Sequence, residues 1–354
     1  MSYRIIPAIM SGGAGTRLWP ASTEAAPKQF HALGGGADSM FVATLRRLSG
    51  GADALAFAPP IVLANAKHAD LVDADLARAD VSAAAIVLEP MARNTAAVGA
   101  IAAAAGAEID PDALILLLPA DHIIADAAAF HAAIARAAPL ARDRIVTFGI
   151  TPDRPATGYG YIKAGEKLAP GVFAIDSFRE KPNLETARDY LAAGGYAWNA
   201  GMFLFSPRVM LEEFAAAADI RDAALTAFKA AKRDGARIEL QREDFAKVRS
   251  TPLDIAVMEQ TRRGAVAPCD IGWADVGAWD EIWRLSPHDA AGNALAGDVV
   301  LLDGANNLIR SDGPKICAAG VNDLIVVATA HAILILPRAR AQDVKALKDL
   351  ADGK

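Results

Sequence analysis

The strongest constraint on the fold is a series of short, continuously apolar segments in the first part of the chain. Strand-length apolar runs occupy residues 4–10, 60–64, 85–88, 113–118 and 144–148. The segments between them that favour helices cover residues 39–48, 67–79, 95–107 and 130–140. Apolar runs without alternation predict strands that are buried on both faces, as in a parallel sheet covered by helices. We therefore expect an α/β fold whose ligands lie beyond the carboxyl ends of the strands.

In the rest of the chain, apolar runs no longer alternate regularly with helical segments. Residues 158–164 and 172–178 read as two strands with a turn between them, and helical segments at 183–193 and 220–232 follow. After residue 287, short β-branched runs alternate with Gly- and Asp-containing turns, up to a final helix at 341–350. The predicted fold class is α/β, a Rossmann-like, doubly wound mixed sheet with a small C-terminal β-rich domain. We place the main domain at residues 1–286 and the β-rich domain with its terminal helix at 287–354.

Composition indicates the class of protein and its compartment. No apolar run in the 354 residues approaches the ~20 needed to span a bilayer, and glycines follow the first apolar run too soon for a signal peptide. The net charge is −6 without a long basic block, which argues against a nucleic-acid partner. Cys269 and Cys317 lack the spacing of a metal site and read as reduced thiols. We expect a soluble, cytoplasmic protein with no membrane partner.

A glycine-rich loop follows the first predicted strand. Gly12, Gly13 and Gly15 allow the backbone to approach an anion closely and to present N–H groups to phosphate oxygens. The loop lacks the Gly-Lys-Ser/Thr of a Walker A motif, and Leu18 stands where a dinucleotide fingerprint needs its third glycine. A plain structural turn is the alternative. Arg17 within the loop, and a lysine shortly after it, would add two cations near a triphosphate.

This GxGTR…PK arrangement resembles the signature of the sugar-1-phosphate nucleotidyltransferases. The resemblance implies that the loop wraps the triphosphate of a nucleotide, with Gly12, Gly13, Gly15 and Thr16 as nucleotide-binding residues. It also implies that Arg17 steadies the departing pyrophosphate and that Lys28 lies near the phosphates, both as catalytic residues. For Lys28 the alternative is a solvated surface lysine.

The segment 89–97 follows a predicted strand and opens a helix. A helix N-terminus with an Asn/Thr cap favours a polar or anionic ligand, although capping alone would explain these residues. The segment is similar to the EPxGRNTAP motif of mannose-1-phosphate guanylyltransferases, with alanine at 92 and 97 in place of glycine and proline. The resemblance implies that the loop faces the guanine base. Its nucleotide-binding residues would be Glu89, Arg93, Asn94 and Thr95.

Two aspartates are the candidate metal ligands. Asp121 follows a buried strand, where an isolated carboxylate would be costly without a counter-ion, and magnesium bridging phosphate oxygens would supply one. Asp275 lies in residues 272–279, which match the family pattern GWxDVGxW. By resemblance, Asp121 and Asp275 hold Mg²⁺, with Mn²⁺ as a possible substitute. For Asp275 the alternative is a helix cap.

Three further segments resemble the family motifs GYGYI, FxEKP and WNxGMF, which line a sugar-phosphate pocket. They occupy residues 158–162, 178–182 and 198–203. The resemblance assigns Lys181 to catalysis as well as to binding. For Glu180 with Lys181, a surface ion pair is the alternative. The implied sugar-phosphate-binding residues are Gly160, Tyr161, Glu180, Lys181, Asn199 and Gly201.

The resemblance spans residues 4–337 and implies one reaction. GTP and α-D-mannose 1-phosphate would give GDP-mannose and pyrophosphate, by Mg²⁺-assisted in-line attack on the α-phosphorus. The same chemistry with another pair, such as glucose 1-phosphate with a different nucleoside triphosphate, is one alternative. A non-catalytic regulatory relative that senses nucleotide sugars is the other. The sequence is compatible with a homodimer but does not specify the oligomeric state.

Overall fold

The computed structural model describes residues 2–13, 15–34, 36–49, 51–52 and 54–353. The chain divides into two compact units, and it passes between them more than once. Unit 1 contains residues up to Gly12, together with Leu45–Ala120 and Ile124–Trp273. Unit 2 contains Gly13–Thr44, Asp121–Ile123 and the chain from Ala274 onward. The domain boundary at residue 286 stays a prediction.

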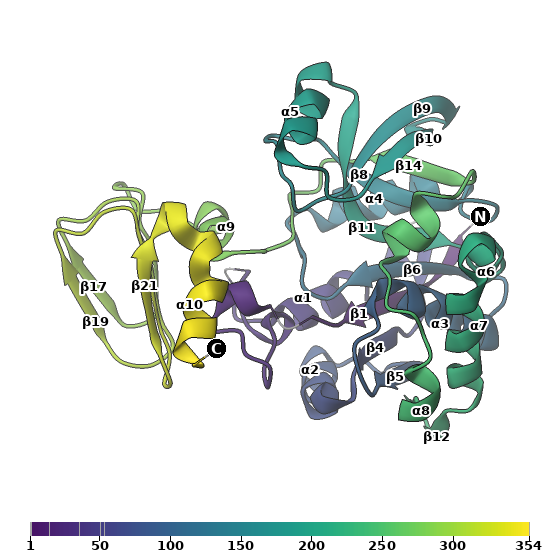
Figure 1. The fold of residues 1–354 in the computed structure, drawn as a ribbon, viewed down its shortest axis with the longest axis horizontal. Coiled ribbons are helices and arrows are strands. Elements are labelled where there is room, and N and C mark those ends of the chain that lie inside the picture. Colours follow the sequence, from purple (N-terminus) through teal and green to yellow (C-terminus); the bar gives the residue numbers. More distant parts are fainter. Residues whose placement is uncertain (1, 14, 35, 50, 53, 354) are drawn as a thin grey trace. The chain divides into compact units, whose positions relative to one another are not determined.

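Unit 1 is built on one large mixed sheet (Figure 1). Two short strands, β2 (Gly51–Ala52) and β3 (Leu55–Phe57), extend it beside β1. Across the sheet, the other strands are β12 (Lys232–Asp234), β13 (Arg237–Glu239), β5 (Ala85–Glu89), β4 (Ile61–Asn65), β1 (Tyr3–Ser11), β6 (Leu114–Pro119), β11 (Tyr196–Phe205), β8 (Ile145–Ile150), β14 (Gly264–Pro268), β10 (Val172–Arg179) and β9 (Tyr161–Ala169).

The central strands carry the predicted apolar runs. β5, β4, β1 and β6 are parallel neighbours, and Ala8 of β1 pairs with Ile61 on one side and Leu117 on the other. Every residue of β6 except the last is buried, as expected of a strand covered on both faces. The α/β class and the mixed sheet are confirmed.

The antiparallel strand β11 was not predicted. It lies between β6 and β8, and Phe203 pairs with Leu117 on one side and Thr147 on the other. Its apolar run is interrupted by Asn199 and Gly201, and its register shifts between Asn199 and Phe203. A polar residue and a glycine within a strand weaken the sequence signal and mark a bulge.

Helices cover the sheet of unit 1, and one group of them forms most of the core. α3 is rich in alanine and buried around most of its circumference, and it packs against α6, α7 and the sheet (Figure 1). The helices are α1 (Met40–Arg47), which continues from unit 2, α2 (Ala69–Ala79) after η3 (Ala66–His68), α3 (Asn94–Ile109), α4 (Ala127–Ala137), α5 (Leu184–Ala193), α6 (Pro207–Glu213), η4 (Phe214–Ala217), α7 (Ala218–Lys229), α8 (Arg242–Phe245) and the π-helix η5 (Asp254–Met258).

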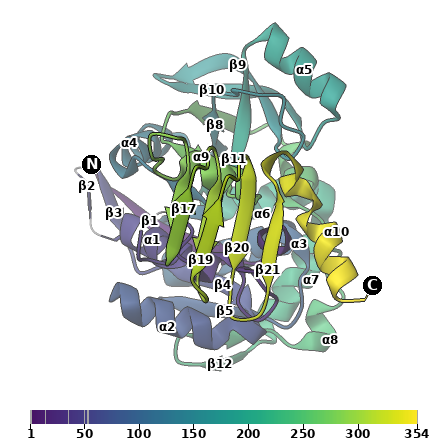
Figure 2. The same ribbon diagram turned by 90° about the vertical axis from the view of Figure 1, so that its left-hand side faces the viewer.

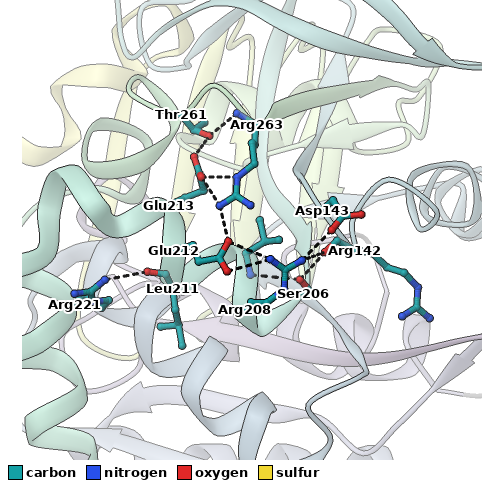
Figure 3. Close-up of polar contacts among 11 residues, drawn as sticks. Arg142, Asp143, Ser206, Arg208, Leu211, Glu212, Glu213, Arg221, Thr261 and Arg263 are labelled. Atoms are coloured by element: carbon teal, nitrogen blue, oxygen red, sulfur yellow. Dashed lines mark hydrogen bonds and ion pairs between the residues drawn. The ribbon is translucent and has the colours of Figure 1, made fainter.

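A network of charged side chains ties α6 to the loops beside it (Figure 3). Arg263 donates from Nε to Glu213 Oε1 at 2.6 Å and from Nη2 to Glu212 Oε2 at 2.9 Å. Arg208 donates to both oxygens of Glu212 and, at 2.9 Å, to Asp143 Oδ1. Because most of these groups are exposed, each ion pair contributes little to the free energy of unfolding. We assign the network to local structure.

Unit 2 has its own core, built around the C-terminal strands. β16, β18, β20 and β21 form one sheet and β17 pairs with β19, and α10 lies beside β21 (Figure 2). Trp279 of α9 is fully buried against apolar residues of these strands and of α10. The elements are η1 (Thr16–Leu18), η2 (Lys28–Phe30), α9 (Trp279–Leu285), β16 (Ala294–Ala296), β17 (Val299–Leu302), β18 (Leu308–Ser311), β19 (Ile316–Ala319), β20 (Leu324–Ala328), β21 (Ile333–Pro337), η6 (Arg338–Asp343) and α10 (Val344–Ala351), with two-residue strands β7 (Ile123–Ile124) and β15 (Trp273–Ala274) where the units meet along the chain.

The predicted β-rich C-terminal region is confirmed, and its strands are mostly parallel, as each turn of the chain adds a strand beside the last. Among the helices that the structure describes, none is both long enough and apolar enough to cross a membrane.

Candidate functional site

Three of the predicted motifs follow strands of the parallel half of the sheet. β1 ends at Ser11, directly before the glycine-rich loop, β5 ends at Glu89, and β6 ends two residues before Asp121. Since these strands run in the same direction, their carboxyl ends share one edge of the sheet, which is where ligands of such folds bind.

Within unit 2, Lys28 joins the two predicted metal-binding residues. Its ammonium group lies 3.0 Å from Asp121 Oδ2 and donates hydrogen bonds to the carbonyl oxygens of Asp275 at 2.7 Å and Val276 at 3.2 Å. Three acceptors match the three N–H groups of the ammonium, and only 13% of the side chain is exposed. Lys28 is therefore an anchor for this cluster, and the alternative of a solvated surface lysine does not describe it.

The backbone after Asp275 is held in an unusual conformation. Val276 has φ of 50°, in the left-handed region that β-branched residues rarely adopt and that costs on the order of 1–3 kcal/mol. This turn directs two successive carbonyl groups at Lys28. Beyond it, a Cβ at Gly277 would lie 3.2 Å from Asp275 Oδ2 and 3.4 Å from Arg17 Nη2. The Asp275 carboxylate and the Arg17 guanidinium therefore lie against the same glycine.

The glycines of the loop differ in their surroundings: Gly12 and Gly13 have open space beside them, whereas Gly15 is closely packed. A Cβ at Gly12 or Gly13 would meet no described atom within 4 Å, so the backbone is open to a ligand there. Gly15 has φ of 55°, and a Cβ would come within 2.6 Å of Ser22 Oγ and 3.1 Å of the Lys28 side chain. Glycine is thus required at 15 both for its conformation and for the packing of Lys28. Thr16 begins the short helix η1 that follows the loop.

The residues of this cluster suit a hard divalent cation. The Asp121 carboxylate and the backbone carbonyl of Asp275 contact the same Lys28 ammonium group. Two aspartates joined in this way offer oxygen ligands alone, as Mg²⁺ prefers. Within the described ranges, no three His, Cys, Asp or Glu side chains form a complete metal cage. A site with two protein carboxylates leaves further positions to phosphate oxygens and water, which is the usual arrangement for Mg²⁺.

In unit 1, the predicted base-binding segment contains a buried carboxyl group. Glu89 is 9% exposed, and burial raises its pKa to about 8. No described group forms a hydrogen bond with its Oε1 atom. A buried, unpartnered carboxyl oxygen is costly unless a ligand supplies a donor, and the N–H groups of a guanine are donors of this kind.

The neighbouring predicted residues mainly hold the local structure. Arg93 donates to the carbonyl oxygens of Phe245 and Ala246, the latter at 2.8 Å. Asn94, at φ of 64°, begins α3 and accepts a hydrogen bond from the Thr95 N–H at 3.1 Å. Thr95 in turn accepts from the backbone of the segment before η5. These contacts shape the loop, and their role in binding a nucleotide stays a prediction.

The buried Glu89 carboxyl predicts a pH-dependent stability. Its ordinary pKa of 4.5 rises to about 8 in the folded protein, so folding takes up a proton between these values. Stability is greatest below pH 4.5 as far as this group is concerned, and it falls by ~1.4 kcal/mol per pH unit until the pH passes 8. Glu89→Gln is expected to remove this slope. Urea denaturation of both proteins at pH 6, 7 and 8 measures it, and equal slopes would contradict the burial argument.

The predicted sugar-binding residues from three segments meet within unit 1. A Cβ at Gly160 would lie 2.8 Å from Glu180 Oε2 and 3.4 Å from Asn199 Cβ. Glu180 Oε1 pairs with Lys181 Nζ at 2.8 Å. The Lys181 side chain is 60% exposed, whereas that of Glu180 is 11% exposed, so the pair presents its cation outward. Tyr161 is buried and packs its ring against Tyr190 at a centroid distance of 5.4 Å.

Asn199 is held by the predicted Gly201 and by two residues that the sequence did not indicate, Thr147 and Asp254. It is 8% exposed, and its Nδ2 atom donates to Asp254 Oδ1 at 2.8 Å. Thr147 Oγ1 donates to Asn199 Oδ1 at 2.7 Å, and the Gly201 N–H donates to the same oxygen at 3.2 Å. A single acidic residue within the apolar run 253–258 was the only sequence signal for Asp254.

Two known protein families match most of the chain. Residues 6–292 match the family described as Nucleotidyl transferase, and residues 297–349 match the family described as MannoseP isomerase/GMP-like beta-helix domain. The chain belongs to the nucleotidyl transferase family. The predicted family, its fold and its enzymatic class are thereby confirmed.

Individual members of the nucleotidyl transferase family match over nearly the whole chain. The alginate biosynthesis protein AlgA of Pseudomonas aeruginosa is 43% identical over 99% of this chain and 73% of its own length. The mannose-1-phosphate guanylyltransferase of Escherichia coli K12 is 42% identical over 99% of this chain and 74% of its own length. A solved structure from Thermus thermophilus, described as a mannose-1-phosphate geranyltransferase, is 27% identical with a TM-score of 0.84, covering 98% of this chain and 99% of that one.

Proposed function

We propose that this nucleotidyl transferase joins GTP to α-D-mannose 1-phosphate, forming GDP-mannose and releasing pyrophosphate. The observation that carries the proposal is the cluster of Arg17, Lys28, Asp121 and Asp275, which combines oxygen ligands for a cation with positive charge. The names of the similar proteins support mannose 1-phosphate as the sugar phosphate.

The phosphate side of the reaction is assigned to unit 2. The open backbone at Gly13 presents N–H groups to the triphosphate, and the exposed Arg17 guanidinium neutralises the charge that develops on pyrophosphate. Asp121 and Asp275 would hold Mg²⁺, which supplies charge neutralisation at the phosphate oxygens when it is bound. Lys28 fixes the spacing of the two aspartates.

The sugar side is assigned to unit 1. Glu180 and Asn199 bind sugar hydroxyl groups, and the exposed Lys181 ammonium binds the phosphate of the sugar. An oxygen of that phosphate attacks the α-phosphorus of GTP, and the bond from the α-phosphorus to the leaving pyrophosphate breaks in line. The attacking oxygen is already ionised, so no general base is needed. Positioning and charge neutralisation therefore account for catalysis.

Pyrophosphate release tests this proposal directly. GTP, ATP, UTP and dTTP are each supplied with magnesium and either mannose 1-phosphate or glucose 1-phosphate. The expected result is strong preference for GTP with mannose 1-phosphate, because a base pocket built on hydrogen bonds can discriminate by ~10⁴ or more. Turnover with a different pair would support the proposed type of reaction and refute the proposed substrates. Binding of GDP-mannose by folded protein without turnover would favour the sensing function.

A further inference from the structure

The π-helix η5 contains a partly buried acidic residue that the proposed reaction does not use. Asp254 begins η5, and its carboxyl group accepts the hydrogen bond from Asn199 Nδ2 at 2.8 Å. π-helical turns are uncommon and occur frequently at functional sites. The contact links this turn to the predicted sugar pocket.

The hydrogen bonds around Asn199 define which way its amide points. The Gly201 N–H can only donate, so the atom that faces it must be the Asn199 oxygen. The nitrogen then faces Asp254, which accepts one of its two N–H groups. No described residue accepts the second N–H group, which is left for a ligand. Asp254 therefore sets the direction of the donor that Asn199 offers.

The same turn supports a second sugar-binding segment. Glu259, whose N–H donates to the Asp254 carbonyl at 2.8 Å, uses its Oε1 atom to accept from the Glu180 N–H at 3.1 Å. The next residue, Lys181, has φ of 45°, a strained conformation that needs support from its surroundings. One short helical turn thus holds both the Glu180–Lys181 pair and Asn199.

We propose that Asp254 is a positioning residue for the sugar, which orients the Asn199 amide toward a hydroxyl group of the sugar phosphate. This inference rests on the proposed function, since it takes the ligand of the pocket to be a sugar 1-phosphate. Without Asp254, the Asn199 amide would keep its oxygen contacts, but its nitrogen would lose the acceptor that holds it.

The charges around Asp254 suit an anionic ligand. Burial raises the pKa of Asp254 to about 7, and the negative charge of Glu180 acts in the same direction. The positive charge of Lys181 and the hydrogen bond from Asn199 oppose this rise in pKa. Near neutral pH a large fraction of Asp254 is protonated, which reduces the repulsion between the pocket and the phosphate of the sugar.

Steady-state kinetics of Asp254 variants test the inference. Asp254→Ala is expected to raise KM for mannose 1-phosphate about tenfold, because a buried donor loses its partner, and to leave KM for GTP within about twofold. Asp254→Asn keeps an acceptor for Asn199, so its KM at pH 6 should stay within about threefold of the natural protein. Above pH 7 the KM of the natural protein should rise, and that of Asp254→Asn should not. Asp219→Ala, at an exposed ion pair, is the matched control for loss of an aspartate.

A double-mutant cycle shows whether Asp254 acts through Asn199. Adding Asp254→Ala to Asn199→Ala should change KM for the sugar phosphate by less than about twofold, because the group that Asp254 orients is already absent. An unchanged sugar KM in Asp254→Ala, or effects that multiply in the double variant, would overturn the inference. If Asp254→Ala does not fold, the pH dependence of KM in Asp254→Asn decides the question, and a profile identical to that of the natural protein refutes it.

Failure of the proposed function would be recognised separately. If the natural protein turns over no sugar 1-phosphate, the reaction assignment is wrong, and Asp254 is then tested without substrate. The side-chain ¹⁵N–¹H signals of Asn199 should shift and exchange faster with water in Asp254→Ala. Unchanged signals would show that Asp254 does not orient the amide.

Discussion

Replacing Asp121 by alanine is expected to lower kcat by ~10³ or more while the protein remains folded. The effect is large because the carboxylate is one of two oxygen ligands proposed for the cation that neutralises the reacting phosphates. The fold should survive because the side chain is partly exposed, and Lys28, its ion-pair partner at 3.0 Å, keeps two carbonyl acceptors. Pyrophosphate release at saturating magnesium, together with circular dichroism, measures both quantities.

Two comparisons separate metal binding from general loss of charge. Asp121→Asn keeps the shape of the side chain and weakens its affinity for a cation, so it should require a higher magnesium concentration and still lose most of kcat. Asp312→Ala removes an exposed aspartate of the same unit that pairs with Arg310, and it should leave kcat unchanged. Near-normal turnover in Asp121→Ala would remove this residue from the mechanism.

The sequence predicts the parts of the fold in which burial dominates. β1 and β6 are continuous apolar runs, and the structure places them side by side in the parallel half of the sheet. β11 was not predicted because Asn199 and Gly201, which we propose bind the sugar phosphate, interrupt the apolar pattern of a central strand. Residues kept for function rather than for burial would weaken the local sequence signal of a strand in this way.

Candidate site residues differ in how far the sequence alone indicates them. Residues in contiguous motifs, such as Arg17 and Asp275, can be recognised from their neighbours. The contact of Lys28 with the Asp275 carbonyl joins residues 247 positions apart, and no local pattern contains it. Asp254 meets Asn199 across 55 positions, and a single acidic residue in an apolar run does not specify its partner. Long-range hydrogen bonds of this kind are visible only once the chain is folded.

Replacing Arg17 by alanine is the second change expected to have a very large effect, a loss of ~10³ in kcat. Its guanidinium is exposed, and its one hydrogen bond to another described residue is a long contact of 3.5 Å with Gln342. This side chain therefore contributes little to the stability of the fold, and its removal should change the free energy of unfolding by less than ~0.5 kcal/mol. Loss of kcat without loss of stability would mark a group that acts on the transition state.

The charge and the shape of Arg17 can be separated in the same assay. Arg17→Lys keeps the positive charge but not the planar fork that binds two phosphate oxygens at once, so it should recover only part of kcat. Arg340→Ala, which removes an exposed arginine paired with Asp343 in the same unit, should leave kcat unchanged. Because pyrophosphate gains negative charge as it departs, a guanidinium that stabilises it contributes more to the transition state than to bound GTP. The loss should accordingly appear in kcat, and a change confined to KM for GTP would show that Arg17 binds the nucleotide without assisting the departure of pyrophosphate.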